Sequence, residues 1–418
     1  MFAFLALSRK MATFARSMEN ITVGLDAKRI VRNGTGLGSY GRTLARDLSL
    51  IEGLNLRLYA PDSGLDELRR QVVEKGNDSG QKDGSKGGSL TFCYPQGWQP
   101  LGKAYWRTRG IVSQLRNDGV QVYHGLSGEL PMGLRRAGIH SVVTIHDLIF
   151  MRHPDWYNTA DVKIYTQKFR HAIEEADRIV AISECTRRDI CELGGIAPEK
   201  VELIYQSCAT RFSPLTSHLS PLTPDAPAPQ LYWYVHDHYD LPDRYVLSVG
   251  TIEERKNALL AVKALHYLPN DLSLVLVGRA TPYSDRVWQY AVENGLGGRV
   301  TMLHNVPDDH LPAIYHMAEA FVYPSRYEGF GIPIIEAIRM RLPVVACTGS
   351  CLEEAGGPHS LYVGPDDERA MADAITRVLY RAQGREQRIE QSQLYIQRFA
   401  NTGAAQRFAD LYRQLAVG

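Results

Sequence analysis

Short runs of aliphatic and β-branched residues alternate with longer amphipathic segments along most of this chain, and the alternation occurs in two successive series. This pattern is typical of a parallel sheet covered by helices on both faces. The sequence therefore predicts an α/β protein with two doubly wound, Rossmann-like domains. Strands are expected at 21–26, 56–60, 90–94, 120–123, 142–146, 179–183 and 201–204, and then at 245–249, 274–277, 300–303, 320–323 and 344–346.

A proline-rich segment separates the two series. Repeated Pro keeps a chain extended, so residues 213–242 are predicted to be a linker. The first domain is then expected at 18–212 and the second at 243–397, followed by a C-terminal helix over 398–418 that returns to the first domain.

Two further segments are predicted to lie outside the folded cores. Residues 76–89 are rich in Gly, Ser, Lys and Asp, which predicts a mobile surface loop. Residues 1–17 precede Met18 and are interpreted as an N-terminal extension from an upstream start rather than a secretion signal, because basic residues follow the apolar run instead of preceding it.

Charge and cysteine content narrow the classes of partner. Lys plus Arg number 47 against 46 for Asp plus Glu, so no overall field favours nucleic acid, and an anionic ligand must be bound locally. The six cysteines are scattered, which favours a reducing compartment. Since no apolar run reaches the roughly 20 residues of a membrane span, we expect a cytoplasmic protein whose membrane contact, where it occurs, would be peripheral.

The second domain contains the most informative stretch, residues 324–337, which follows a predicted strand. Pro333 suits the first turn of a helix, and Gly329 and Gly331 allow the backbone to approach a ligand. A helix start of this kind can bind a diphosphate through exposed N–H groups. Glu336, inside the helix, could accept hydrogen bonds from the two hydroxyls of a ribose.

Other side chains are expected near the same diphosphate. Glu328 precedes the helix and could reach the hydroxyls of a transferred sugar. Gly250 follows the first strand of the second domain, and Arg255 and Lys256 lie just beyond it, before a helix that Asn257 could cap. Two cations there can neutralise a diphosphate and stabilise it as it leaves.

The stretch 324–337 and the segment Gly-Thr-Ile-Glu-Glu-Arg-Lys-Asn at 250–257 closely resemble retaining glycosyltransferases of family 4 with the GT-B fold. The resemblance implies two facing Rossmann-like domains with the active site in the interdomain cleft, and a retaining hexosyltransferase. It implies that Glu328 contacts the donor sugar, that Glu336 binds the ribose, and that Lys256 binds phosphate. Phe330 belongs to the matched Gly-Phe-Gly. Many relatives carry Arg where this chain has Thr251, and Arg255 is expected to compensate.

The first domain contributes a glycine-rich turn at 33–40 and the pair His146 and Asp147 at a strand end. By the resemblance, Gly36 lies against the donor phosphates, and His146 lies beside the donor sugar and helps to orient it. Tyr40 and Asp147 are candidates for the acceptor side. The catalytic residues are thus predicted to be Glu328, His146 and Lys256.

The identity of the donor is less legible. The base is expected near Asn305 and Val306, where main-chain groups could hold it. The runs Thr-Ile-His-Asp-Leu-Ile-Phe and Arg-His-Pro-Asp-Trp-Tyr resemble bacterial mannosyltransferases of polysaccharide assembly, which favours GDP-mannose over UDP-glucose. The acceptor is expected to be a saccharide or a lipid-linked saccharide.

No metal or other cofactor is predicted, because no Asp-x-Asp lies near a strand end to hold a cation against the diphosphate. The nucleotide-sugar would be a co-substrate. Two other functions remain open from the sequence: a nucleotide-sugar epimerase, which would act on donor alone, and a non-catalytic assembly protein that binds a nucleotide-sugar.

Overall fold

The chain divides into two units in a computed structural model that describes residues 20–34, 36–73, 88–96, 102–206, 208–209, 211–212, 230–399 and 401–417. One unit comprises Met1–Ser207 together with Asn401–Gly418, and the other comprises Cys208–Ala400. The expected extension at 1–17, most of the expected loop at 76–89 and the proline-rich part of the expected linker lie outside the described residues.

The first unit is built on a parallel sheet with the strand order β3-β2-β1-β4-β5-β6-β7. The direction in which successive strands are added reverses between β1 and β4, as in doubly wound folds. In such folds, ligands bind beyond the carboxyl ends of the strands at this point. The strands are β1 (Ile21–Asp26), β2 (Leu54–Tyr59), β3 (Ser89–Cys93), β4 (Val122–Gly125), β5 (His140–Ile145), β6 (Arg178–Ala181) and β7 (Val201–Leu203).

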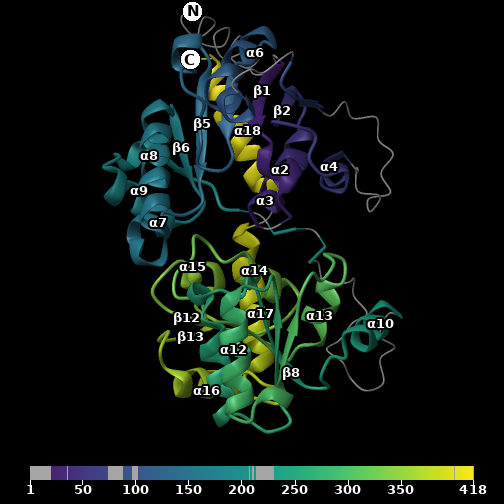
Figure 1. Cartoon of the computed structure of the whole chain (residues 1–418). Helices are drawn as coiled ribbons and strands as arrows, with labels where there is room; N and C mark the ends of the chain where they lie inside the picture. The colour runs from purple at the N-terminus through teal and green to yellow at the C-terminus, as the bar shows by residue number, and fades with distance from the viewer. Residues whose placement is uncertain are drawn as a thin grey trace, which may run out of the picture. The chain divides into compact units, whose positions relative to one another are not determined.

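Helices cover both faces of this sheet (Figure 1). On one face, the C-terminal helix α18 packs with α3 against β1 and β4, and buries Phe408 and Tyr412. On the other face, Trp106 and Phe169 belong to a second apolar cluster. The helices are α2 (Lys28–Arg32), α3 (Gly36–Ser49), α4 (Asp66–Val73), α5 (Gly102–Tyr105), the π-helix η1 (Trp106–Gly110), α6 (Ile111–Asn117), α7 (Ile149–Arg152), α8 (Thr159–Glu175), α9 (Glu184–Gly194) and α18 (Asn401–Val417), with short 3₁₀ turns at Arg135–Ala137, Pro154–Trp156 and Pro198–Lys200.

The second unit has a parallel sheet with the order β10-β9-β8-β11-β12-β13. Its strands are β8 (Tyr245–Val249), β9 (Ser273–Val277), β10 (Val300–Leu303), β11 (Ala320–Tyr323), β12 (Val344–Cys347) and β13 (Leu361–Val363). Its helices are α10 (Gln230–Tyr239), α11 (Ala258–Ala264), α12 (Pro282–Glu293), α13 (Leu311–Met317), α14 (Ile332–Arg339), α15 (Leu352–Gly356), α16 (Glu368–Thr376) and α17 (Arg385–Ile396), with 3₁₀ turns η5 (Glu254–Lys256), Leu265–Tyr267, Gly297–Arg299 and Gln397–Phe399.

The predicted fold class, two doubly wound Rossmann-like sheets, is confirmed, and the expected strands are present with shifts at their ends. One strand was missed: β13 has three residues, all only partly buried, so it carries little apolar signal. Within the segment predicted to be a linker, 213–242, residues Gln230–Tyr239 form α10, where Tyr232 is buried and stacks on His316 with ring centroids 4.8 Å apart. Similarly, Ser89, placed in the predicted loop, begins β3.

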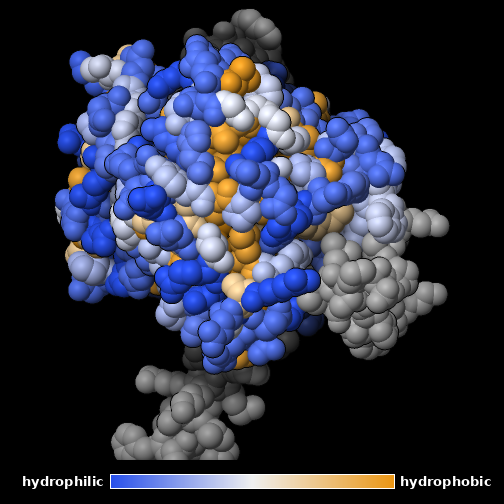
Figure 2. Space-filling model, turned by 90° about the horizontal axis from the view of Figure 1, so that it is seen from below, coloured by the Kyte–Doolittle hydropathy of each residue, from blue (hydrophilic) through white to orange (hydrophobic). Residues whose placement is uncertain are grey.

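The face of the molecule in Figure 2 is mostly hydrophilic, with a central band of apolar side chains and smaller apolar patches toward its edges. Apolar area is concentrated instead in the clusters on the sheets, as burial of apolar surface requires. Among the described residues, no helix is both long and apolar enough to cross a bilayer.

Candidate functional site in the second unit

The carboxyl ends of β8 and β9 approach each other closely. Gly250 follows β8 with φ 151°, and its N–H donates to the carbonyl of Val277 at 2.9 Å. Gly278 follows β9, where an added Cβ would lie 1.8 Å from the carbonyl oxygen of Gly250. Gly278 is therefore required sterically. It was missed because one glycine in a strand-end turn gives no distinctive sequence signal.

Arg255 and Lys256 lie in the 3₁₀ turn η5, which follows this glycine turn. Asn257 then adopts a left-handed conformation, with φ 56°. It occupies the position before α11 as expected, but its side chain makes no cap hydrogen bond and donates instead to the carbonyl of Pro365 at 2.8 Å. Asn257 thus anchors the cationic turn to the loop after β13.

Glu328 lies between the two cations. The Nζ atom of Lys256 is 2.5 Å from Oε1 of Glu328, and an Nη atom of Arg255 is 3.0 Å from Oε2. The Tyr323 hydroxyl donates to Oε1 at 3.3 Å and accepts from Lys256 at 2.7 Å. The structure therefore places three predicted donor-site residues in one ion cluster.

This cluster fixes the charge of Glu328. Burial opposes ionisation of the carboxyl group, but Lys256 and Arg255 outweigh burial and hold its pKa at about 2. The same carboxylate raises the pKa of Lys256, again against burial. At neutral pH the three side chains thus carry two positive charges and one negative charge in a site where each is at least four-fifths buried.

Backbone geometry prepares the start of α14. Gly331 precedes the helix with φ 112°, a conformation that side chains disfavour, and no side chain caps the helix. The predicted helix start at Pro333 is thus present, and it leaves backbone donors open to a ligand. Phe330 is buried and packs against Phe399, with ring centroids 5.2 Å apart. This contact anchors the loop between β11 and α14 to the core of the second unit.

The loop that carries Glu328 is also held by Cys351, which sequence reasoning did not assign. Its buried thiol lies 3.1 Å from the carbonyl oxygen of Glu328 and 2.8 Å from that of Phe330. A thiol is a weak hydrogen-bond donor, but here it lies within hydrogen-bond distance of two carbonyl oxygens, one on either side of Gly329. No spacing signal links Cys351 to this loop.

Glu336 lies in α14 in a different setting. The Tyr315 hydroxyl donates to its Oε2 atom at 2.9 Å. Burial raises the pKa of Glu336 to about 7, although the hydrogen bond from Tyr315 and the charge of Arg211 oppose the rise. This carboxyl group can therefore change charge near neutral pH.

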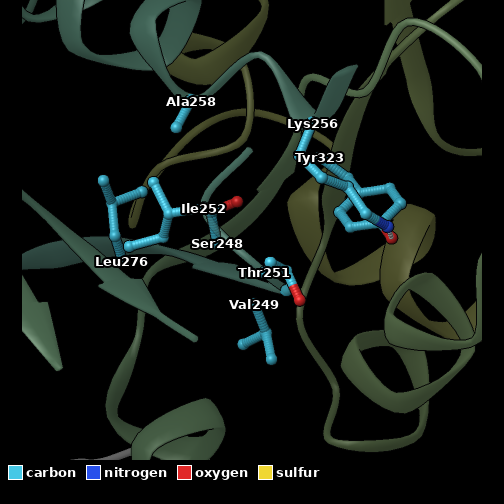
Figure 3. A pocket seen from close by; sticks show the side chains of 9 residues that line it. Ser248, Val249, Thr251, Ile252, Lys256, Ala258, Leu276 and Tyr323 are labelled. Carbon is cyan, nitrogen blue, oxygen red and sulfur yellow. Dashed lines mark hydrogen bonds between the residues drawn. The ribbon is translucent and has the colours of Figure 1, made fainter. Parts of the chain in front are cut away.

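A small pocket of about 20 Å³ opens beside these groups, at the ends of β8 and β9. Figure 3 shows Lys256 and Tyr323 on one side and Ile252, Leu276 and Ala258 on the other. The pocket has room for a water molecule and not for a nucleotide.

Asn305 and Val306 follow β10 at the same edge of the sheet. Asn305 is exposed and left-handed, with φ 56°, and Val306 is partly exposed. Neighbouring His304 donates a hydrogen bond from Nδ1 to the Gly278 carbonyl oxygen at 2.7 Å. Because a carbonyl oxygen can only accept, Nδ1 carries the proton. The predicted base-binding segment thus borders the glycine turns.

In the first unit, both ring nitrogens of His146 form hydrogen bonds. Its Nε2 donates to the Leu126 carbonyl at 2.8 Å, and its Nδ1 accepts from the Gln206 amide at 2.7 Å. Burial lowers the pKa of His146 to about 4, so the ring is neutral at pH 7. As it stands, neither ring nitrogen is available to orient a sugar, and a direct catalytic role would require one of these bonds to break.

The two acceptor-side candidates lie beside it. The Tyr40 ring meets the His146 ring edge-on at 4.8 Å, and its hydroxyl lies 3.4 Å from the Thr144 hydroxyl. Asp147 accepts from the N–H of Ile149 at 3.2 Å. His124, which bonds to Tyr412 of α18 at 2.6 Å, is a buried structural residue.

In the glycine-rich turn, the crowded glycine is not Gly36. Gly36 begins α3, and an added Cβ there would meet no atom of the described residues within 4 Å. Gly38 is the crowded position, since its Cβ would lie 1.8 Å from the Asn33 carbonyl oxygen. Buried Arg42 donates to that oxygen at 2.7 Å and holds the turn.

Within the part of the chain that the structure describes, no group of three His, Cys, Asp or Glu side chains is arranged to hold a metal ion.

Two nucleotide-binding-type domains and a cationic site at a helix start define a GT-B glycosyltransferase. Family models match both halves: "Glycosyltransferase Family 4" matches residues 34–210, and "Glycosyl transferases group 1" matches residues 238–394. The chain belongs to glycosyltransferase family 4, a retaining family of hexosyltransferases. Membership confirms the predicted enzyme class, a glycosyltransferase of family 4.

Individual relatives agree. O-antigen chain mannosyltransferase B of Escherichia coli is 28% identical over 350 residues, covering 82% of this chain and 87% of that protein. Sucrose-phosphate synthase of Thermosynechococcus elongatus has a similar structure, with a TM-score of 0.72 at 22% identity over 94% of this chain and 99% of the other. HepE of Anabaena, solved with UDP-glucose, gives a TM-score of 0.69 at 15% identity over 93% and 98%. These two structures support the fold.

Proposed function

We propose that this glycosyltransferase transfers mannose from GDP-mannose to a saccharide or lipid-linked saccharide in polysaccharide biosynthesis. The observation that supports a diphosphate donor is the pairing of Lys256 and Arg255 with Glu328 beside the start of α14. The sugar follows from the similarity to O-antigen chain mannosyltransferase B over most of both chains. UDP-glucose, the molecule bound by HepE, is the second candidate donor.

In the proposed mechanism, the donor diphosphate competes with Glu328 for Lys256 and Arg255. The released carboxylate then accepts hydrogen bonds from the sugar hydroxyls. Lys256 stabilises the negative charge that grows on the departing nucleoside diphosphate. One well-placed donor of this kind contributes about 3–4 kcal/mol to the transition state. The acceptor hydroxyl oxygen bonds to the anomeric carbon on the face that the diphosphate leaves, as the bond to the diphosphate breaks. Its proton passes to the departing diphosphate, and configuration is retained.

The remaining site residues have supporting roles in this proposal. Glu336 binds the ribose, Gly250 and the loop Gly329–Gly331 bring backbone to the phosphates, and Asn305 and Val306 flank the base. Gly36 and His146 of the first unit contact the donor, and Tyr40 and Asp147 the acceptor. We propose that transfer needs no metal, because Lys256 and Arg255 supply the positive charge.

A thermal-shift screen of GDP, UDP and ADP tests the donor. A ligand that binds only the folded state stabilises it by RT ln(1 + [L]/Kd), or about 2.7 kcal/mol at 100 times Kd. We expect GDP alone to raise the melting temperature; a response to UDP alone would contradict GDP-mannose. Transfer is then measured with and without acceptor, in excess chelator, where activity should persist. Activity that disappears with chelator and returns with magnesium would exclude the metal-independent mechanism.

A further inference from the structure

A cluster of charged side chains lies at the carboxyl edge of the sheet in the first unit, outside the donor site described above. We call it the basic edge. It comprises the cations Lys28, Arg29, Arg32, Lys103, Arg107 and Lys168 and the carboxylates Asp26, Asp62 and Glu129.

Two helices present their cations four residues apart. Lys28 and Arg32 lie on one face of α2, and Lys103 and Arg107 lie on one face of the continuous helix α5–η1. Asp62, just beyond β2, joins the two helices, because it pairs with both Arg32 and Lys103. The cations of α2 and α5–η1 therefore line the same stretch of sheet edge.

The other two carboxylates of the basic edge, Asp26 and Glu129, also form ion pairs. Asp26, at the end of β1, lies 3.1 Å from Arg107 and accepts the backbone N–H of Lys28 at 3.1 Å. Glu129, beyond β4, is shared between Arg107 and Lys168, each at 2.8 Å. These two cations outweigh burial and lower the pKa of Glu129 to about 2.

The basic edge thus contains six basic and three acidic side chains, a formal excess of three positive charges, whereas the whole chain carries a formal charge of only +1. Among the described residues, neither Lys28 nor Arg29 forms a salt bridge with a carboxylate. Burial and the charges of Arg107 and Arg29 lower the pKa of Lys28, and Glu129 and Asp26 oppose this shift. The positive charges of Arg107 and Arg29 therefore act on Lys28, and an anion bound beside Lys28 would offset this repulsion.

Part of the basic edge is buried, which strengthens its electrostatic interactions. The side chain of Arg107 is 18% exposed and that of Asp26 only 4%, so solvent screens this part of the cluster weakly. Arg107 also lies in a π-helical turn, Trp106–Gly110, a rare distortion that is frequent at functional sites.

From this juxtaposition we infer that the basic edge binds a phosphate or diphosphate group of the acceptor, with Lys28 and Arg29 as its direct ligands. The inference rests on the proposed function, since it names the acceptor as an anionic saccharide. The group recognised is the same whether it belongs to a lipid diphosphate or to a water-soluble sugar phosphate.

Inorganic pyrophosphate and farnesyl diphosphate are the probes, titrated into the full chain by calorimetry. Because pyrophosphate can also bind at Lys256, the titrations use a Lys256→Ala background. Adding Lys28→Gln and Arg29→Gln should weaken both probes about tenfold. The matched control, Arg116→Gln with Arg136→Gln, removes two exposed cations near the amino ends of β4 and β5 and should change affinity less than about twofold.

The outcomes separate the two proposals. If Lys256→Ala alone abolishes pyrophosphate binding, the basic edge is not a phosphate site, and the donor site stands. Equal affinity in the Lys28→Gln, Arg29→Gln protein and its control would overturn the inference, as would an effect on farnesyl diphosphate alone. Should the double variant not fold, Lys103→Gln, at a side chain 60% exposed, should weaken both probes about threefold, and no change would equally refute the site.

Discussion

Two glutamates of the same sequence motif, Glu328 and Glu336, have opposite electrostatic environments. Glu328 lies between Lys256 and Arg255, and its pKa is about 2. Glu336 has a neutral partner, Tyr315, and burial raises its pKa to about 7. The difference shows that a motif specifies residue types, whereas the charge each one carries depends on what packs against it. One carboxylate is permanently ionised, and the other responds to pH.

The largest expected effect comes from removing the cation that defines the first environment. Lys256→Ala should lower kcat for transfer by about 10²–10³-fold, since it removes a charge that stabilises the leaving diphosphate. Lys263→Ala, in the next helix, is the control and should retain wild-type turnover. Steady-state kinetics with the active donor and acceptor measure both. Wild-type turnover in Lys256→Ala would refute the proposed role.

Stability should depend on pH in opposite directions at the two sites. The folded-state pKa of Glu336 lies above the ordinary glutamate value of 4.5, so its ionisation destabilises the fold progressively from pH 4.5 to 7, by at most about 3 kcal/mol. Glu336→Gln should therefore gain stability relative to wild type as pH rises across this range.

Glu328 should behave in the reverse way. Its depressed pKa contributes stability that is present above pH 4.5 and is lost as pH falls toward 2, so Glu328→Gln should lose stability relative to wild type at neutral pH. Urea unfolding of wild type and both variants at about pH 3, 4.5 and 8 measures both trends, because the Glu328 contribution changes below pH 4.5 and the Glu336 contribution changes above it. The same pH trend in both variants would show that their environments do not differ as described.

A smaller effect is expected on donor binding. If Glu336 accepts hydrogen bonds from the ribose, Glu336→Gln should raise the KM for donor about tenfold with little change in kcat, because the interaction is present before and during transfer. Wild-type donor affinity should also fall as pH drops below about 7, where Glu336 takes up a proton. A pH-independent affinity that Glu336→Gln leaves unchanged would place the ribose elsewhere.

The smallest effect concerns the loop beneath Glu328. Cys351→Ala removes the thiol near the carbonyls of Glu328 and Phe330 and should destabilise the protein by about 1 kcal/mol. Cys351→Ser keeps a donor and should restore part of this loss. Thermal melts and kcat report the two effects. If serine is no better than alanine, the thiol acts by packing and not by hydrogen bonding.

Much of the fold could be predicted because the strands of a covered parallel sheet are continuous apolar runs, as at Tyr245–Val249 and Val142–Ile145. Elements without such an apolar run were not predicted from the sequence. The strand Leu361–Val363 is short and partly exposed, and the helix Gln230–Tyr239 was assigned to the linker because proline precedes it. At the site, the family resemblance placed Glu328, Lys256 and Glu336 in one region, and two of them do form an ion pair.

Other features depend on residues that are distant in the chain. The partners of His146, Leu126 and Gln206, lie 20 and 60 positions away, so its neutral, doubly bonded ring had no sequence signal. Gly278 is crowded by a carbonyl from another strand, and Cys351 reaches a loop more than twenty positions earlier.

The sequence by itself determined the two parallel α/β sheets and which chemical groups follow their strands, because apolar periodicity and glycine or proline positions act locally along the chain. Only the tertiary structure decided which of these groups are charged and which are already bonded. Lys256 and Glu328 are 72 positions apart in sequence and 2.5 Å apart in space. Electrostatic energy depends on the distance between charges in space, so the charge state of these side chains can be inferred only from the folded structure.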